Sequence, residues 1–114
     1  MFRKVLYNNL RKEEKAKAKG GKIMEKITID KFFELKDKIE IGIHCNTEAK
    51  ANALCKAFDK AGQKWCDGTS YLSDNEFVYY GKDTCYTNDN YVDHLIYLEM
   101  EAAPVIEFED VDLT

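Results

Sequence analysis

Two periodic patterns of apolar residues meet in one continuous stretch of the chain, residues 39–65. The stretch opens with three isoleucines at alternate positions, which is the period of a strand with one buried face. Apolar residues then recur three or four positions apart from Ala51 to Ala61, as they do along one face of a helix. Asn46 and Thr47 offer side-chain oxygens to the free amides of a helix start, and Gly62 suits the residue after a helix end. The stretch therefore predicts a strand that leads directly into a capped helix.

The segments on either side of this unit predict further elements. Residues 27–38 favour a short helix that turns its two phenylalanines inward. Residues 76–88 predict a β-hairpin, because the pair Gly81-Lys82 suits a two-residue type II′ turn. Both faces of such a hairpin carry aromatic or apolar side chains. One face is therefore expected to meet a helix, a partner subunit or a ligand.

The segment from 88 to 104 fits two patterns. Tyr91, Leu95 and Leu98 lie on a helical stripe, but Leu98 and Met100 also belong to an alternating, strand-like run. We favour the helix, because Pro104 would end it. Residues 105–109 then predict a final strand.

The resulting order, β-α-β-β-α-β, predicts a small fold of the α/β (α+β) class. We expect a two-layer sandwich in which an antiparallel or mixed sheet carries its helices on one face. A ferredoxin-like arrangement is one candidate for its topology.

Length and composition indicate one small domain with an extension. A chain of 114 residues with 45% apolar content has room for one core. Residues 1–23 are expected to form a basic N-terminal appendage, either helical or disordered. Met24 is a second plausible start of the protein in the same frame. Residues 24–114 are expected to form a single α/β ligand-binding domain.

A cytoplasmic location is expected. No apolar run approaches the roughly 18 residues of a membrane span, and the basic start lacks the apolar segment of a secretory leader. The four cysteines include no Cys-x-x-Cys pair, so we expect reduced thiols.

Charge is divided unevenly along the chain. Residues 1–22 hold eight Lys or Arg and two Glu, a net of +6, so the chain total of −4 leaves −10 for residues 23–114. An acidic body disfavours binding to a polynucleotide, whose phosphates need a basic face. The basic segment is expected to be a solvated tail rather than a nucleic-acid contact.

No motif indicates an enzyme. His44 and Cys45 are neighbours in a predicted strand, so their side chains point to opposite faces and cannot act as a pair. The His and Cys residues lack the spacing of a metal site, and the sequence has no phosphate loop or dinucleotide fingerprint. We therefore expect neither catalysis, nor a metal, nor a cofactor.

Aromatic residues leave binding and core packing as alternatives. Trp65 lies just past the predicted helix, where a tryptophan is usually part of the core but also suits stacking on a ring. The seven tyrosines and several asparagines supply stacking area and adaptable hydrogen bonds. The same residues could instead complete the core and its rim.

Three stretches resemble a group of small phage-encoded proteins, the Thoeris anti-defence sponges. They are IGIHCNTEAKANALCKAFDKAGQKWCDG from Ile41, YYGKDTCYTN from Tyr79 and VIEFEDV from Val105, and the resemblance spans residues 39–110. Those sponges sequester cyclic ADP-ribose isomers made by bacterial TIR-domain enzymes, and some relatives capture cyclic oligonucleotides. The resemblance implies a phage protein that binds a cyclic nucleotide immune signal, of the glycocyclic ADP-ribose type, without cleaving it.

The resemblance also implies a site and an assembly. It implies a homo-oligomer, a dimer or higher, with the ligand between subunits in the host bacterial cytoplasm. By position, Tyr80 would stack on adenine and Asn90 would make a polar contact, with Asn88, Lys82 and Trp65 as lesser candidates. Arginine is absent after Arg11, so lysines or backbone amides would have to hold the phosphates.

Two other functions remain open. The acidic body would suit an anti-CRISPR-like inhibitor that blocks the nucleic-acid groove of a defence complex. A small housekeeping domain without a ligand is the third hypothesis. A sponge needs a pocket with aromatic walls, whereas an acidic decoy needs carboxylates spread along one exposed face.

Overall fold

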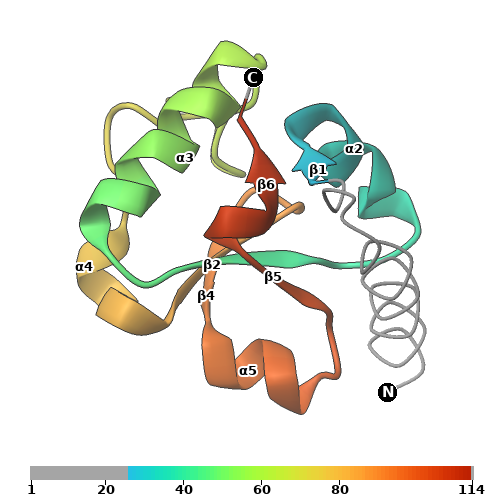
Figure 1. The fold of residues 1–114 in the computed structure, drawn as a ribbon. Helices are drawn as coiled ribbons and strands as arrows, with labels where there is room; N and C mark the ends of the chain where they lie inside the picture. The colour runs from blue at the N-terminus through green and yellow to red at the C-terminus, as the bar shows by residue number, and fades with distance from the viewer. Residues whose placement is uncertain (1–25, 114) are drawn as a thin grey trace, which may run out of the picture.

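The computed structural model of the chain describes residues 26–113 (Figure 1). Its helices are α2 (Ile29–Glu34), α3 (Glu48–Lys60), α4 (Phe77–Tyr80) and α5 (Leu95–Met100), with 3₁₀ turns η1 (Leu35–Asp37), η2 (Gly81–Asp83) and η3 (Phe108–Asp110). Its strands are β1 (Ile27–Thr28), β2 (Gly42–Cys45), β3 (Thr84–Thr87), β4 (Val92–His94), β5 (Val105–Glu107) and β6 (Val111–Asp112). The proposed appendage at residues 1–23 lies outside the described residues.

A four-stranded mixed sheet, in the order β4-β3-β2-β5, forms the centre of the fold. β2 runs antiparallel to β3 and parallel to β5, and β3 runs antiparallel to β4. β1 and β6 form a separate parallel pair that joins the two ends of the described chain. The helices and mixed sheet confirm the predicted small α+β fold.

The predicted unit of strand and capped helix is present. The Thr47 hydroxyl accepts a hydrogen bond from the Lys50 amide at the start of α3. At the other end, the Gly62 amide donates to the Asp59 carbonyl and the Gln63 amide to the Phe58 carbonyl. These two hydrogen bonds, together with Gly62 at φ +83°, form the Schellman motif that ends the helix.

One face of the sheet carries the larger core. Ile43, Tyr86 and Ile106 from three neighbouring strands are buried against Leu54 and Phe58 of α3. The two phenylalanines of α2 turn inward as predicted, and both rings lie within 5.7 Å of the Phe58 ring, measured between ring centroids.

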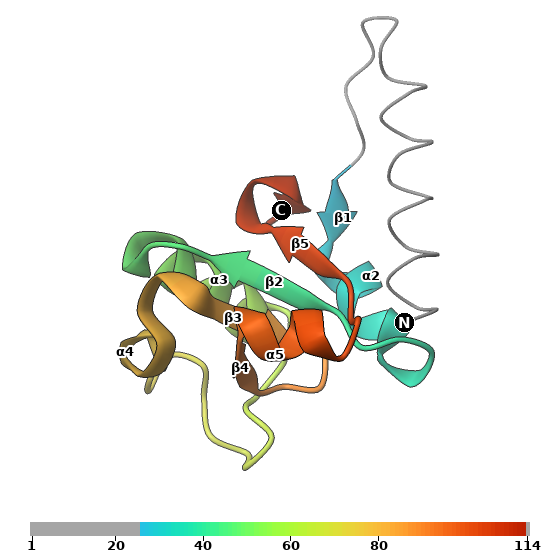
Figure 2. The ribbon, with the colours of Figure 1, turned by 90° about the horizontal axis from the view of Figure 1, so that it is seen from below.

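The opposite face is covered by α5, which corrects the prediction that the helices lie on one face. Figure 1 shows α2 and α3 above the sheet and α5 below it, and Figure 2 shows α5 in front of the sheet with α3 behind. Leu98 of α5 forms a small second core with Cys85 and Ala103. Gly42 lies directly under Leu98, and a Cβ atom added to Gly42 would fall 2.4 Å from the Leu98 Cδ1 atom. The sequence suggested one buried face for this strand, whereas the fold buries both.

The ferredoxin-like candidate is also corrected. The main sheet does use six elements in the order strand, helix, strand, strand, helix, strand, if the one-turn α4 is set aside. In a split β-α-β arrangement, however, another strand separates the two strands joined by a helix. Here α3 joins β2 and β3, which are adjacent and antiparallel.

The hairpin predicted at 76–88 is wrong. Gly81 does have the backbone angles of a type II′ turn, φ 54° and ψ −130°, but residues 77–80 before it are helical. Side-chain oxygens of Asp74 and Asn75 accept from the Glu76 and Phe77 amides and so begin a helical turn instead of a strand.

The hairpin of this region joins β3 to β4. Its loop is Asn88-Asp89-Asn90, and Asn90 adopts the left-handed conformation at φ 66° that commonly closes a three-residue hairpin loop. The helix favoured for 88–104 is confirmed only at Leu95–Met100, because residues 92–94 pair with β3. The His94 Nδ1 atom accepts from the Ile96 amide at 3.0 Å and begins that helix.

Within residues 26–113, no helix is long and apolar enough to cross a membrane.

We predict that Gly42→Ala lowers the free energy of unfolding by about 1–3 kcal/mol, because the added methyl group overpacks the contact with Leu98. Urea denaturation of the single variants and of Gly42→Ala/Leu98→Ala measures the effect. The double variant should lose less stability than the sum of the two single losses, since Leu98→Ala makes room for the methyl group. If the stability losses of the two single variants simply add in the double variant, residues 42 and 98 are not in steric conflict.

Candidate ligand-binding pocket

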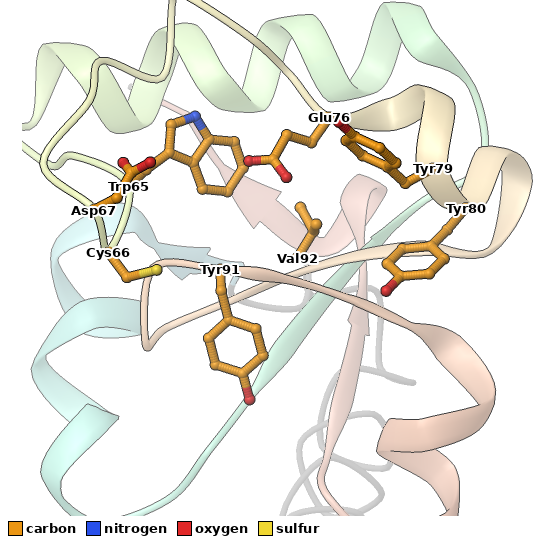
Figure 3. Close-up of a pocket in the computed structure, with 8 residues that line it drawn as sticks. All are labelled: Trp65, Cys66, Asp67, Glu76, Tyr79, Tyr80, Tyr91 and Val92. Carbon is orange, nitrogen blue, oxygen red and sulfur yellow. The ribbon is translucent and has the colours of Figure 1, made fainter.

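A pocket of about 410 Å³ opens where three loop segments meet at the end of the sheet (Figure 3). Residues 65–67 follow α3, residues 76–80 include α4, and residues 91–92 lie where the β3–β4 loop enters β4. Its lining consists of Trp65, Cys66, Asp67, Glu76, Tyr79, Tyr80, Tyr91 and Val92. Four of these eight side chains are aromatic and two are carboxylates. Such a concave site with aromatic walls and few polar groups is typical of small-molecule binding.

Backbone hydrogen bonds fix the first segment against the β3–β4 loop. The Cys66 amide donates to the Asn90 carbonyl at 2.8 Å, and the Trp65 amide donates to the Thr69 carbonyl at 2.9 Å. The Schellman end of α3 reverses the chain just before these bonds. The pocket wall is therefore held by main-chain contacts on two sides.

Trp65 belongs to the core and also forms part of the pocket. Its side chain is 5% exposed, its ring centroid lies 4.3 Å from that of Tyr71, and its indole N–H donates to the Asp74 carbonyl at 3.0 Å. The interpretation of Trp65 as a core residue is thus confirmed, while one part of the ring borders the pocket (Figure 3).

Tyr80 lies at the pocket as a half-buried residue at the end of α4, not at the end of a strand. Its ring packs edge-on against His94, with ring centroids 5.5 Å apart. Tyr79 precedes it and is 66% exposed, so it forms the outer rim. The two tyrosines present ring surface to the same opening (Figure 3).

Asn88 lies away from the pocket and is fully buried. Its side-chain oxygen accepts from the Ile41 amide at 3.1 Å, and its side-chain NH₂ donates to the Phe32 and Ile39 carbonyls at 3.2 and 3.0 Å. Both polar atoms of the amide are engaged inside the protein. The position corrects the expectation that Asn88 contacts a ligand, because a ligand could reach it only by breaking the core.

Asn90 and Lys82 lie close to the pocket but do not line it. The Asn90 side-chain NH₂ donates to Gln63 Oε1 and to the Tyr71 hydroxyl oxygen, both at 3.1 Å, so it supports the pocket from behind. Lys82 is exposed in η2, and its carbonyl accepts from the Nε2–H of His44 at 2.7 Å. Of the five expected site residues, only Trp65 and Tyr80 line this pocket.

Sequence reasoning missed Tyr91 and both carboxylates. Tyr91 was assigned to a helical stripe, whereas it borders the pocket and its hydroxyl donates to the Glu40 carboxylate. Burial, followed by this hydrogen bond, raises the pKa of the Tyr91 hydroxyl. No spacing in the sequence links Trp65 with Tyr91, since only the two loops that meet here bring them together.

The electrostatics of the lining are negative. Glu76 is partly withdrawn from water, and this desolvation, followed by the charges of Asp74 and Asp67, raises the pKa of its carboxyl group. Hydrogen bonds from the Thr69 hydroxyl and amide lower the pKa of Asp67 and keep it ionised. No Lys, Arg or His is among the residues that line this pocket.

A second pocket of about 410 Å³ lies between α3 and residues 71–75. Its lining is mostly polar, including Asn52, Lys56, Ser73 and Asn75, and Asn75 already bonds across it to Asn52 at 2.6 Å. Among residues 26–113, no three His, Cys, Asp or Glu side chains are grouped as a metal site would require. The aromatic pocket is therefore the better candidate for a ligand.

The sequence matches no protein-family model and no curated protein, and the fold matches no solved structure. The interpretation of the pocket accordingly depends on its own geometry and chemistry.

We predict that Asn88→Ala lowers the free energy of unfolding by about 3 kcal/mol or more, since it leaves three backbone groups near Ile39, Ile41 and Phe32 without partners. Asp89→Ala, at the exposed neighbouring position, serves as the control and should stay near the parent. Chemical denaturation followed by far-UV circular dichroism measures both. An Asn88→Ala variant as stable as the control would show that the amide network contributes little.

We predict that Cys66 alone reacts with Ellman's reagent in the folded protein, and all four cysteines react after unfolding. Cys66 is exposed, whereas burial raises the pKa of the Cys45 and Cys85 thiols and raises that of Cys55 to about 12. The thiolate is the reactive form, so the buried thiols should be inert. A folded Cys66→Ser variant that still reacts rapidly would contradict this arrangement.

Proposed function

We propose that this chain is a non-catalytic binding protein that captures a small molecule with a planar ring. The ligand proposed is an adenine-containing cyclic nucleotide signal of the glycocyclic ADP-ribose type, as the resemblance to the Thoeris sponges implies. One observation carries the proposal: Trp65, Tyr79, Tyr80 and Tyr91 line one pocket, and Tyr80 is the residue expected to stack on adenine. Stacking of a base on an aromatic side chain contributes roughly 1–3 kcal/mol.

The composition of the pocket favours capture over conversion of the ligand. A nucleophilic mechanism needs a nucleophile within hydrogen-bond reach of a base that a third group orients. Cys66 is the one thiol at this pocket, and no His or Lys accompanies it in the lining. The aromatic faces and carboxylates can hold and orient a ring without attacking it.

The biological setting belongs to the same proposal. The protein would be made by a phage, act in the cytoplasm of the infected bacterium, and lower the free concentration of an immune signal. It would act as a homo-oligomer, a dimer or higher, with the ligand held between subunits. Exposed apolar side chains beside the pocket support this assembly, since Val78 is 83% and Tyr79 66% exposed.

Intact recovery of the ligand tests the proposal most directly. Purified protein is incubated with a panel of cyclic nucleotides, separated from free ligand, heated, and the released molecules are identified by mass spectrometry. Release of an unaltered cyclic nucleotide supports capture. A converted product would indicate an enzyme, and no retained ligand from the panel would refute the proposed ligand class.

We predict that Tyr80→Ala weakens binding of the captured nucleotide by about five- to 150-fold, the equivalent of one lost stacking contact. The melting temperature should change little, because Tyr80 is only half-buried. Tyr97→Ala is the matched control, since Tyr97 also packs edge-on against His94, at 5.9 Å, but lies outside the pocket. Isothermal titration of the parent and both variants separates the roles, and equal affinity for parent and Tyr80→Ala would exclude the stack.

A further inference from the structure

Glu76 holds a strained position at the edge of the pocket. It precedes α4 with φ 56° and ψ 14°, the left-handed conformation that residues with a Cβ atom rarely adopt. Such backbone conformations are energetically unfavourable and cluster at ligand sites. The strained backbone directs the Glu76 carboxylate into the pocket, between Trp65 and Tyr79 (Figure 3).

The Glu76 carboxylate is not paired with any side chain among residues 26–113. Its backbone amide donates to Asp74 Oδ1 at 2.8 Å, but no hydrogen bond or ion pair joins its side chain to another residue in the described part of the chain. It is also partly desolvated and faces the negative charges of Asp74 and Asp67. A carboxylate in this situation gains from a ligand that supplies a hydrogen-bond donor.

The same charges act against a phosphate in this pocket. The lining offers the two carboxylates of Asp67 and Glu76 and no basic side chain. Two unit charges about 6 Å apart in water-like surroundings change an affinity by about threefold, and by more where water is excluded. A phosphate dianion placed here would form four such repulsive pairs, two with each carboxylate.

We infer that this pocket holds the uncharged, donor-bearing end of the ligand and leaves its phosphates outside. The inference rests on the proposed function and specifies which half of the nucleotide the pocket recognises. The ring lies against the tyrosines and Trp65, and Glu76 accepts a hydrogen bond from the exocyclic amino group or the ribose hydroxyls. Glu76 is the specificity-determining residue, because its carboxylate accepts a hydrogen bond from a donor on the ligand and repels an anion.

The protein carries its own probe for the test. Trp65 is the single tryptophan of the chain and borders the pocket, so its fluorescence reports occupancy. Adenosine and adenosine 5′-monophosphate are titrated against the full chain up to millimolar concentration. We expect adenosine to bind at least about threefold more tightly than the monophosphate, from the repulsion of one pair of charges.

Glu76→Gln separates this repulsion from other causes. The amide keeps an acceptor oxygen but removes the charge, so adenosine should bind more weakly and the preference over the monophosphate should fall towards one. Glu101→Gln removes the same charge from the exposed residue that follows α5 and should keep the parental preference. A preference that both variants lose equally would assign it to net charge and overturn the role of Glu76.

The remaining outcomes distinguish a failure of this inference from a failure of the proposed function. Equal or tighter binding of the monophosphate overturns the inference. A change in Trp65 fluorescence with tetramethylammonium, a cation that has no hydrogen-bond donor, also overturns it if adenosine gives no change. If the cyclic nucleotide is captured intact but adenosine leaves Trp65 unchanged, the inference fails while the proposed function stands. If neither the cyclic nucleotides nor adenosine bind, the proposed function itself fails.

Discussion

The buried amide of Asn88 is the contact on which the rest of this structure depends. It bonds to backbone groups of Phe32, Ile39 and Ile41, and so joins α2, the approach to β2 and the β3–β4 loop at one point. Because the Ile41 amide is held by this side chain, the ladder of β2 begins one residue later, at Gly42. A buried backbone group without a partner is costly, so the amide sets the position of β2 relative to both neighbouring segments.

The consequences of this constraint extend to the pocket. The loop that begins at Asn88 continues through Asn90, which bonds to Gln63 and Tyr71, and ends at Tyr91 and Val92 in the pocket wall. The pocket is thus built from loops that are fixed to a rigid sheet, the usual arrangement for a binding site. Under the proposed function, the aromatic faces would accept many rings, while the Glu76 carboxylate, which has no side-chain partner among residues 26–113, would favour donors and disfavour anions.

Prediction from the sequence worked where one local pattern decided the structure. The unit of β2 and α3 was predicted because alternation, a Thr cap and a terminal Gly agree with one another. The hairpin at 76–88 failed for the opposite reason, since Gly81 has the expected turn angles but Asp74 and Asn75 begin a helical turn ahead of it. Residues 88–104 contain both a strand and a helix, but the alternating run that includes Leu98 and Met100 lies in the helix, and the strand is at Val92–His94, where neither pattern placed one.

By itself, then, the sequence determined the α+β class, the caps of α3 and the burial of its apolar face, because these depend on neighbours three or four residues apart. Only the tertiary structure decided that Gly42 is covered by Leu98, that Asn88 is a core residue, and that Trp65, Glu76 and Tyr91 meet. Those contacts join segments far apart in the chain, and their partners are set by the strand order. The type of a residue fixes the chemistry of its side chain, whereas the residues that it contacts depend on the path of the whole backbone.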